Sequence, residues 1–308
     1  MIVTDNSLAG RAYRWLYQHG GWVPWLLLLV PLSWFLLGYM GALVNLLINS
    51  FYAIDDFSGI LIKKFTLKTY GEIFQLSNLN IIIRSTVMAA LVTITSIALA
   101  MPIAWYAARY GSGRMRAFLY LAIMLPLWSS YLVRVYAWKL ILAKEGVITY
   151  IFDRLHIMPL LDGVLSLPVI GGPSLSFSLI GTYLVFVYLW LPYMILPMLA
   201  SFERVPLSLQ ESSSDLGAKP WQTFRYVVLP QAVPGIAAGS IFTFSLTLGD
   251  YITPTIIGSS RVFIGQAVYS HQGVAGNLPL AAVFSIAPII IMAGYLFFAG
   301  RLGAFKAL

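Results

Sequence analysis

The sequence predicts an all-α integral membrane protein with six transmembrane helices. Apolar residues form 59% of the 308 residues and charged residues only 10%, against roughly 45–50% and 25% in soluble globular proteins. So few charges cannot cover a water-exposed surface, and most of the outside must therefore face lipid. Cysteine is absent and only three histidines occur, which excludes a disulfide framework, thiolate metal sites and cysteine catalysis.

Long uncharged stretches recur along the chain, and each can hold one span of about 20 residues once its loop-like ends are trimmed. The expected spans lie near 22–44, 82–107, 117–139, 175–200, 232–257 and 280–300. Together they form one transmembrane domain over 22–300. The first span is longer than the apolar part of a signal peptide, and no small-residue cleavage site follows it. The third is the least regular, because Arg134 and Lys139 fall in its last part.

Loop charges predict the orientation. With the N-terminus inside, the inner segments 1–21, 108–116, 201–231 and 301–308 have a net charge of +6, and the outer segments have about +1. Basic residues concentrate in cytoplasmic loops, and short loops such as 108–116 have the most weight. The N-terminal segment 1–21 and the tail 301–308 are therefore expected in the cytoplasm. The overall charge of +8 reflects this bias and gives no information about a cargo.

The inner loop 201–231 is too long for a simple connection, since loops within helical bundles usually have about 2–8 residues. Pro206 suits the start of a helix, Gly217 suits a left-handed stop, and Pro220 suits the start of a second short helix ending near Pro230. The loop is therefore expected to form a helix–turn–helix. It could rest on lipid headgroups as an amphipathic hairpin, or it could fill a groove on a soluble partner.

The spacing of residues in this loop resembles the signature of binding-protein-dependent ABC importer permeases. That signature is Glu-Ala-Ala, three residues, Gly, nine residues, Ile, one residue and Leu-Pro. This chain has Glu211, Gly217, Val227, Leu229 and Pro230 at those spacings. It departs from the signature at Ser212 and Ser213, which replace the alanines, and at Val227, which replaces isoleucine. The strings LPLWSSYLVRVYAW (125–138), LPYMILPMLASFERV (191–205) and LGDYITPTIIG (248–258) resemble the B subunit of spermidine/putrescine-type permeases.

The resemblance implies a type I ABC importer (MetI-like) permease fold with a cytoplasmic coupling-helix hairpin. It also implies four kinds of partner, namely a second permease subunit of the C type, two cytoplasmic ATPase subunits, an extracytoplasmic substrate-binding protein and the lipid of a bacterial inner membrane. The residues expected to couple transport to the ATPase are Glu211, Ser212, Ser213, Asp215, Gly217, Ala218, Leu229 and Pro230. No cofactor is expected on this chain, and ATP and Mg²⁺ would be used by the partner ATPases. No G-x-x-x-x-G-K-[ST] motif occurs in the sequence.

Charges within spans are costly and are therefore functional candidates, and two of them matter here, Arg134 and Asp250. If the helices are continuous, Arg134 and Asp250 lie about 26–27 Å from the inner ends of their spans, at similar depth near the outer surface. They could form a structural ion pair or reach separately to the outer interface. Alternatively, Asp250 could line the pathway and meet a cationic substrate. Aromatic rings that could receive ammonium groups or serve as packing and interface residues are Trp128, Tyr131, Trp138, Tyr188 and Tyr251.

Tyr131, Arg134 and Trp138 share one helical face that is expected to point inward. The function that these observations favour is one permease half of an importer for a small, cationic solute such as a polyamine. Amino acids, opines or other small solutes are alternatives within the same architecture. A membrane enzyme is disfavoured, because the histidines do not cluster with an acid at membrane depth. A secondary transporter or channel is disfavoured because no internal repeat relates the two halves.

Overall fold

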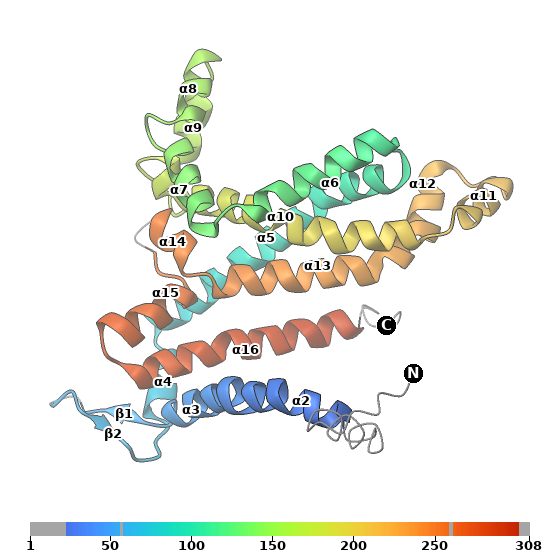
Figure 1. Cartoon of the computed structure of the whole chain (residues 1–308). Helices are drawn as coiled ribbons and strands as arrows, with labels where there is room; N and C mark the ends of the chain where they lie inside the picture. Colours follow the sequence, from blue (N-terminus) through green and yellow to red (C-terminus); the bar gives the residue numbers. More distant parts are fainter. Residues whose placement is uncertain (1–22, 56–57, 259–260, 302–308) are drawn as a thin grey trace, which may run out of the picture.

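The computed structural model describes residues 23–55, 58–258 and 261–301 and consists mainly of helices (Figure 1). Five helices are long and apolar enough to cross a membrane, namely Leu27–Asn49, Leu76–Arg109, Leu179–Arg204, Pro220–Gly249 and Leu278–Arg301. A sixth span results if the bent pair Gly113–Trp128 and Tyr131–Ile141 crosses as one. The expected helical membrane architecture is confirmed. The N-terminal segment 1–21 and the tail beyond Arg301 lie outside the described residues.

The first half of the chain contains the N-terminal spanning helix, a small hairpin and the second and third spans. Its elements are α2 (Val23–Ser33), the π-helical η1 (Trp34–Met40), α3 (Gly41–Asn49), β1 (Ala53–Ile54), β2 (Leu61–Ile62), α4 (Lys68–Ile73), α5 (Leu76–Arg109), α6 (Gly113–Trp128), α7 (Tyr131–Ile141), α8 (Val147–Arg154) and α9 (Met158–Leu165). β1 and β2 pair antiparallel with Ala53 opposite Ile62. This short β-hairpin is the one departure from an all-helical chain among the described residues.

The second half contains the central helices and the hairpin expected from the signature. Its elements are η2 (Leu175–Phe177), α10 (Leu179–Arg204), α11 (Leu207–Asp215), α12 (Pro220–Thr223), η3 (Phe224–Val228), α13 (Leu229–Gly249), α14 (Ile252–Ile256), α15 (Ile264–Tyr269), η4 (Ser270–Val274) and α16 (Leu278–Arg301). The start of α2, the end of α16 and the α11–α12 hairpin lie at one end of the bundle (Figure 1). We call this the hairpin end and the opposite end, where α14 lies, the α14 end.

Helix α10 is the centre of the bundle, and its most extensive contacts are with α13 and α5. Val185, Phe186 and Leu189 of α10 are completely buried. The Ser178 hydroxyl caps the start of this helix by accepting from the Gly181 amide at 3.0 Å. The helix ends at Arg204 because the following Val205 precedes a proline and is extended. An apolar helix that is buried on this scale needs helices on most of its sides, and α5 and α13 supply them.

The contact of α13 with α10 depends on two glycines four residues apart. A Cβ atom at Gly235 would lie 2.4 Å from the Pro197 carbonyl oxygen and 2.2 Å from Ser201 Oγ, and a Cβ at Gly239 would lie within 3.0 Å of Met194. Small residues at this spacing let two membrane helices approach closely, because packing and not the hydrophobic effect holds helices together in lipid. The backbone of α13 at these two glycines therefore packs directly against residues of α10.

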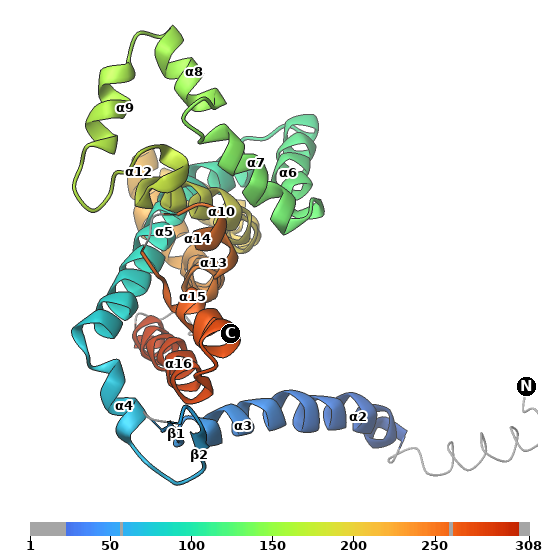
Figure 2. The same ribbon diagram turned by 90° about the vertical axis from the view of Figure 1, so that its left-hand side faces the viewer.

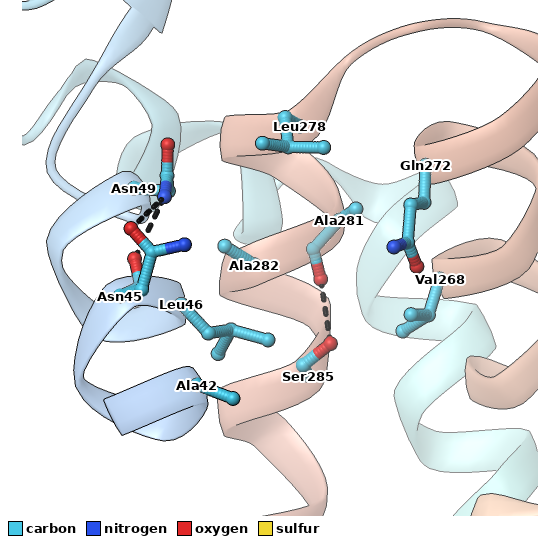
Figure 3. A pocket seen from close by; sticks show the side chains of 10 residues that line it. All are labelled: Ala42, Asn45, Leu46, Asn49, Val268, Gln272, Leu278, Ala281, Ala282 and Ser285. Carbon is cyan, nitrogen blue, oxygen red and sulfur yellow. Dashed lines mark hydrogen bonds between the residues drawn. The ribbon is translucent and has the colours of Figure 1, made fainter. Parts of the chain in front are cut away.

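The N-terminal helix packs differently from the other long helices. None of the residues in its most apolar window is buried, and the bundle meets it mainly where α3 contacts α16. Figure 2 views α10, α13 and α16 nearly end-on, and α2–α3 lies across that view, so it diverges from them. Between α3 and α16 lies a cavity of about 260 Å³ that Asn45, Asn49, Gln272 and Ser285 line together with apolar residues (Figure 3).

The expected third span at 117–139 is wrong as a continuous helix. The helix ends at Trp128, and α7 leaves at 98° to α6. Ser129 and Ser130 are both extended, with ψ of 149° and 136°, and the Ser129 hydroxyl donates to the Pro126 carbonyl at 2.9 Å. A serine side chain that bonds to the backbone in this way competes with the next helical turn. The estimated depth of Arg134, which assumed a straight helix, is therefore wrong as well.

The expected fifth span at 232–257 also differs from the structure. Its helix begins at Pro220 and ends at Gly249, and Asp250 is extended with ψ of 125°. The Asp250 carboxylate then caps the short helix α14 by accepting from the amides of Ile252 at 2.8 Å and Thr253 at 3.2 Å. Asp250 is thus a helix-capping residue between two helices and does not lie within a span.

Replacement of Gly235 by valine should destabilise the bundle, because the added side chain collides with the Pro197 carbonyl. Overpacking costs about 1–3 kcal/mol, so the midpoint of heat-induced aggregation in detergent should fall by several degrees. The matched control is Gly294→Val in α16, where nothing lies within 4 Å of an added Cβ. Equal midpoints for the two variants, measured by size-exclusion chromatography after heating, would contradict the close packing of α13 on α10.

Candidate functional site

The α11–α12 hairpin ends its first helix with a glycine stop. Gly217 has φ of +80°, the left-handed conformation that glycine adopts readily. Its amide donates to the Ser214 carbonyl at 2.8 Å, and the Ala218 amide donates to the Ser213 carbonyl at 3.1 Å. These are the two bonds of a Schellman motif, which satisfies the last carbonyls of a helix. The predicted role of Gly217 as a left-handed stop is confirmed.

The second helix of the hairpin does not end near Pro230, as the sequence suggested. The chain stays helical from Pro220 to Gly249, and it passes into Pro230 through the π-helical segment η3. A proline has no amide to donate, and its ring clashes with the carbonyl four residues earlier. A π-turn changes the bonding register at this place, so that the helix continues. One helix of 30 residues therefore joins the hairpin to the α14 end, over about 45 Å at 1.5 Å per residue.

An arginine from α5 fixes the chain where it enters the hairpin. Arg109 donates to the Phe202 carbonyl at 3.1 Å and also to the Val205 carbonyl. These are carbonyls at the end of α10, where a basic side chain also interacts favourably with the helix dipole. The Trp105 ring packs against the rings of Phe202 and Phe224 at 5.3 Å each. The start of the hairpin is therefore attached to α5 by both polar and apolar contacts.

An ion pair attaches the same junction to α6. Arg116 pairs with the Glu203 carboxylate, and the Tyr120 hydroxyl donates to the same carboxylate oxygen at 2.8 Å. Within the hairpin, Ser213 Oγ lies 3.0 Å from Thr223 Oγ1, which links α11 to α12. These bonds hold the hairpin as a defined projection at one end of the bundle (Figure 1).

The outer surface of the hairpin presents acidic and apolar side chains without a covering element. Of the expected coupling residues, Glu211, Ser212, Asp215, Gly217 and Pro230 are exposed, and Ser213, Ala218 and Leu229 are half-buried. Leu216 is 89% exposed and Trp221 is 64% exposed. Large apolar side chains beside carboxylates on a projecting hairpin are typical of a docking surface. This surface suits insertion into a cleft of another protein.

At the opposite end of the bundle, Asp250 is the centre of a hydrogen-bonded cluster. Its second carboxylate oxygen accepts from the Thr253 hydroxyl at 2.6 Å and from the Tyr131 hydroxyl. The Tyr131 and Thr253 hydroxyl oxygens are themselves 2.6 Å apart. Tyr131 is the first residue of α7, so this cluster joins the bend after α6 to the end of α13.

The ion pair that the sequence allowed between Arg134 and Asp250 is not formed. The Asp250 carboxylate is occupied by Tyr131, Thr253 and backbone amides. The Nε and Nη1 atoms of Arg134 are buried without a hydrogen-bond partner, and its guanidinium carbon lies 6.0 Å from the centre of the Tyr131 ring. The cation therefore rests over an aromatic face, which is favourable but weaker than a paired carboxylate.

The aromatic candidates divide into three groups. Tyr131 stacks on Trp190, and Trp138 packs against Tyr188 at 5.1 Å, so the predicted inward face of α7 is confirmed. Trp128 is 78% exposed and belongs to neither pair. Tyr251 stacks on Tyr269 at 5.0 Å, and both rings line a cavity of about 440 Å³ with Gln272 and Ser285.

Comparison with known proteins assigns this arrangement to a family. Residues 100–304 match the family described as the binding-protein-dependent transport system inner membrane component. The chain belongs to this family. Its members are permease components of ABC importers, and ATP is hydrolysed on separate subunits, so the permease is not an enzyme.

Two curated relatives cover most of the permease. It is 53% identical over 299 residues to the "Inner membrane ABC transporter permease protein YdcU" of Escherichia coli, covering 97% of this chain and 96% of the relative. It is 28% identical over 253 residues to the "Spermidine/putrescine transport system permease protein PotB" of Salmonella typhimurium, covering 81% of this chain and 84% of the relative.

Solved structures confirm the type I importer fold. The permease is similar, at 15% identity and a TM-score of 0.69, to a chain of a bacterial ABC transporter that imports the acidic polysaccharide alginate. That match covers 95% of this chain and 98% of the other. A second structure of the alginate transporter, in complex with an alginate pentasaccharide-bound periplasmic protein, has a TM-score of 0.68 and covers 95% of this chain.

Several residues at the two sites were missed by sequence reasoning. Arg109 and Arg116 were counted only as charges that set the orientation, and Glu203, Phe202 and Tyr269 were not singled out. The Arg116–Glu203 pair spans 87 positions, and no local spacing predicts such a contact. A weak signal was present, because Arg109 and Arg116 lie at the two ends of one short loop that must sit beside the end of another span.

Replacement of Arg109 by methionine should loosen the hairpin without unfolding the permease. The change removes both bonds to the end of α10, and one hydrogen bond to a charged group contributes about 1.5–3 kcal/mol. Since about 1.4 kcal/mol corresponds to a factor of ten, even the loss of one such bond makes opening at least about tenfold more frequent. Chymotrypsin should then cleave at exposed Trp221 about tenfold faster. The control is Arg114→Met in the same loop, and equal cleavage rates in the two variants would contradict this attachment.

Proposed function

We propose that this permease forms half of the translocation pathway of an importer for a small organic cation, with a polyamine as the leading substrate class. An extracytoplasmic binding protein would deliver the solute, and a second permease subunit of the C type and two ATPase subunits would complete the complex. The observation that carries the proposal is the projecting α11–α12 hairpin that continues without a break into α13. Amino acids, opines and other small solutes are the alternatives within the same architecture.

The hairpin end of the bundle is proposed to face the cytoplasm. The basic loop that contains Arg109, Arg114 and Arg116 lies at this end, as the positive-inside rule requires. The start of α2 and the end of α16 lie there too (Figure 1). The α14 end then faces the extracytoplasmic side, where a binding protein would deliver its ligand.

The hairpin is proposed to be the element that couples ATP hydrolysis to the pathway. Docking would bury the exposed Leu216 and Trp221, while Glu211 and Asp215 would set the register through charge complementarity. A movement of the hairpin would be transmitted by the helix Pro220–Gly249 to the cluster around Asp250. The permease thus needs no nucleotide site of its own, and ATP with Mg²⁺ would act on the partner subunits.

The substrate class is proposed from the extracytoplasmic end and the relatives together. The similarity to a spermidine/putrescine permease supports a polyamine, and the Tyr251–Tyr269 pair offers aromatic faces on which ammonium groups can rest. Asp250 supplies a negative charge beside this pair. Its carboxylate already accepts several bonds, so a cation would meet it through long-range attraction more than through a direct contact.

Gly217→Asp should leave the permease in the membrane but abolish ATP-dependent uptake. Aspartate tolerates the left-handed backbone better than most residues, and nothing lies within 4 Å of an added Cβ, so the local fold is retained. The added charged side chain would obstruct close approach of the ATPase. Gly273→Asp at the opposite end, where an added Cβ also meets nothing, is the control. Normal uptake by vesicles that contain the Gly217 variant would refute the coupling role.

Asp250→Asn should reduce uptake of a diamine more than uptake of a neutral amino acid. Loss of one charge interaction at an effective dielectric constant near 20 changes uptake by about tenfold or more. Tyr131→Phe is the matched variant, because it removes a bond to Asp250 and keeps the charge. The measurement is ATPase stimulation of the reconstituted complex by its loaded binding protein, with polyamines, amino acids and anions compared. Equal losses for charged and neutral substrates would leave Asp250 a purely structural role.

A further inference from the structure

The segment from α7 to α8 forms an arm that leaves the bundle at its α14 end. Helix α7 turns by 98° from α6, and α8 and α9 continue the arm roughly at right angles to the long helices in both views (Figures 1 and 2). Because the long helices cross the bilayer, an element perpendicular to them runs parallel to the membrane surface. Its position at the end of the bundle corresponds to the level of the lipid headgroups.

One face of α7 packs inward and the other is apolar and uncovered. The inward face carries Tyr131, Val135 and Trp138, which pack with α10. The opposite face is exposed, and its apolar residues are between 47% and 73% exposed, namely Leu132, Val133, Tyr136 and Leu140. The half-buried Lys139 borders this face, and its ammonium nitrogen lies 6.0 Å from the centre of the Phe177 ring. In water this face would be an unfavourable apolar surface on a helix, and it needs an apolar environment.

Helix α8 has a second exposed apolar surface, separated from that of α7 by a turn in which Lys144 and Glu145 are exposed. Its exposed apolar residues recur at helical spacing and form one stripe, at Val147, Tyr150, Ile151 and Leu155. Its other apolar residues, Ile148 and Phe152, pack against the core, while Asp153 and Arg154 are exposed. The stripe ends in a polar group, because Arg154 Nε donates to the Tyr150 hydroxyl at 3.3 Å. Tyrosine and arginine at the edge of an apolar stripe are typical of a membrane interface.

The apolar surface also joins the arm to a lipid-facing helix. Helix α6 has four large apolar side chains that are more than half exposed, namely Phe118, Leu121, Leu125 and Trp128. This helix leads directly into α7. Along the chain, exposed apolar side chains therefore occur on both sides of the bend at Ser129 and Ser130, on α6 and on α7. These exposed side chains distinguish the arm from a loop in water.

We propose that the α7–α8 arm lies flat in the lipid interface, with the stripe Val147–Tyr150–Ile151–Leu155 inserted into the bilayer. The occupant of this face is thus the membrane lipid. The binding protein and the second permease subunit are the competing occupants. An arm anchored in this way fixes the depth of the Tyr131–Asp250–Thr253 cluster relative to the bilayer, because Tyr131 is the first residue of α7. This anchoring of the arm in the lipid interface does not depend on which solute the importer transports.

The absence of cysteine from all 308 residues makes spin labelling the direct test. Single cysteines at Leu140 and Ile151 would report from the arm, and Asp153, which is exposed on α8 but off the stripe, is the matched control. Ile290 of α16, 65% exposed, is the lipid reference, and Lys64, which is exposed just after the β1–β2 hairpin, is the water reference. The complete complex is reconstituted in liposomes, and accessibility to oxygen and to a water-soluble nickel chelate is measured for each label.

The proposal expects labels at Leu140 and Ile151 to behave like the Ile290 label, with oxygen accessibility above that to the nickel chelate. The Asp153 label should show the opposite order, as the Lys64 label does. Nickel accessibility at Ile151 that disappears only when the binding protein is added would overturn the proposal in favour of that protein. Low accessibility of Ile151 to both reagents would overturn it in favour of a protein interface with the second permease. Transport activity is measured on the same samples, so failure of the arm and failure of the importer assignment give different results.

Discussion

The cluster of Tyr131, Asp250 and Thr253 is the constraint on which one half of this molecule depends. Where a helix ends, backbone amides and carbonyls lose their partners within the helix and need other ones. Two spanning segments of this permease end close together in space, one after Trp128 and one after Gly249. The Asp250 carboxylate satisfies the amides of the second break and accepts the hydroxyl of Tyr131 from the first. Without this carboxylate the amides of Ile252 and Thr253 and the hydroxyl of Tyr131 would lose this acceptor.

One continuous helix connects the Tyr131–Asp250–Thr253 cluster to the α11–α12 hairpin. The helix Pro220–Gly249 has the hairpin at its start and the Asp250 cluster at its end. It is held against α10 by the close approach at Gly235 and Gly239. With the proposed coupling role, the ATPase and the solute entrance would lie at opposite ends of this single packed helix. ATP hydrolysis on separate subunits is a property of the importer family, and the proposed task of this helix is to transmit movement between the two ends.

Much of the fold could be predicted because the physical signals are local. Runs without charge identify spans, and Pro206 with Gly217 identifies a short helix and its stop. The break at Ser129 and Ser130 could not be predicted, because the apolar pattern continues through it and each serine alone is tolerated in a membrane helix. The passage through Pro230 was also missed, since the π-helical segment Phe224–Val228 that leads into it has no local signal in the sequence.

The candidate sites show the same division between local and distant signals. The coupling residues follow a spacing that can be read along the chain. The contacts that hold the hairpin, from Arg109 to Phe202 and from Arg116 to Glu203, join residues 87–93 positions apart. The capping role of Asp250 was missed because the carboxylate looked like a charge within a helix. Only the end of α13 at Gly249 makes it the cap of α14.

Site-specific cross-linking tests the coupling account most directly. A cysteine at Glu211 is the only thiol in an otherwise cysteine-free chain, and a short bifunctional cross-linker can be applied to membranes that carry out uptake. The account predicts an adduct between this chain and a subunit that contains a phosphate-binding loop, in high yield from Glu211 and absent when the cysteine is placed at Gly273. An adduct of equal yield from Gly273, or uptake-competent membranes without an ATPase adduct at Glu211, would contradict it.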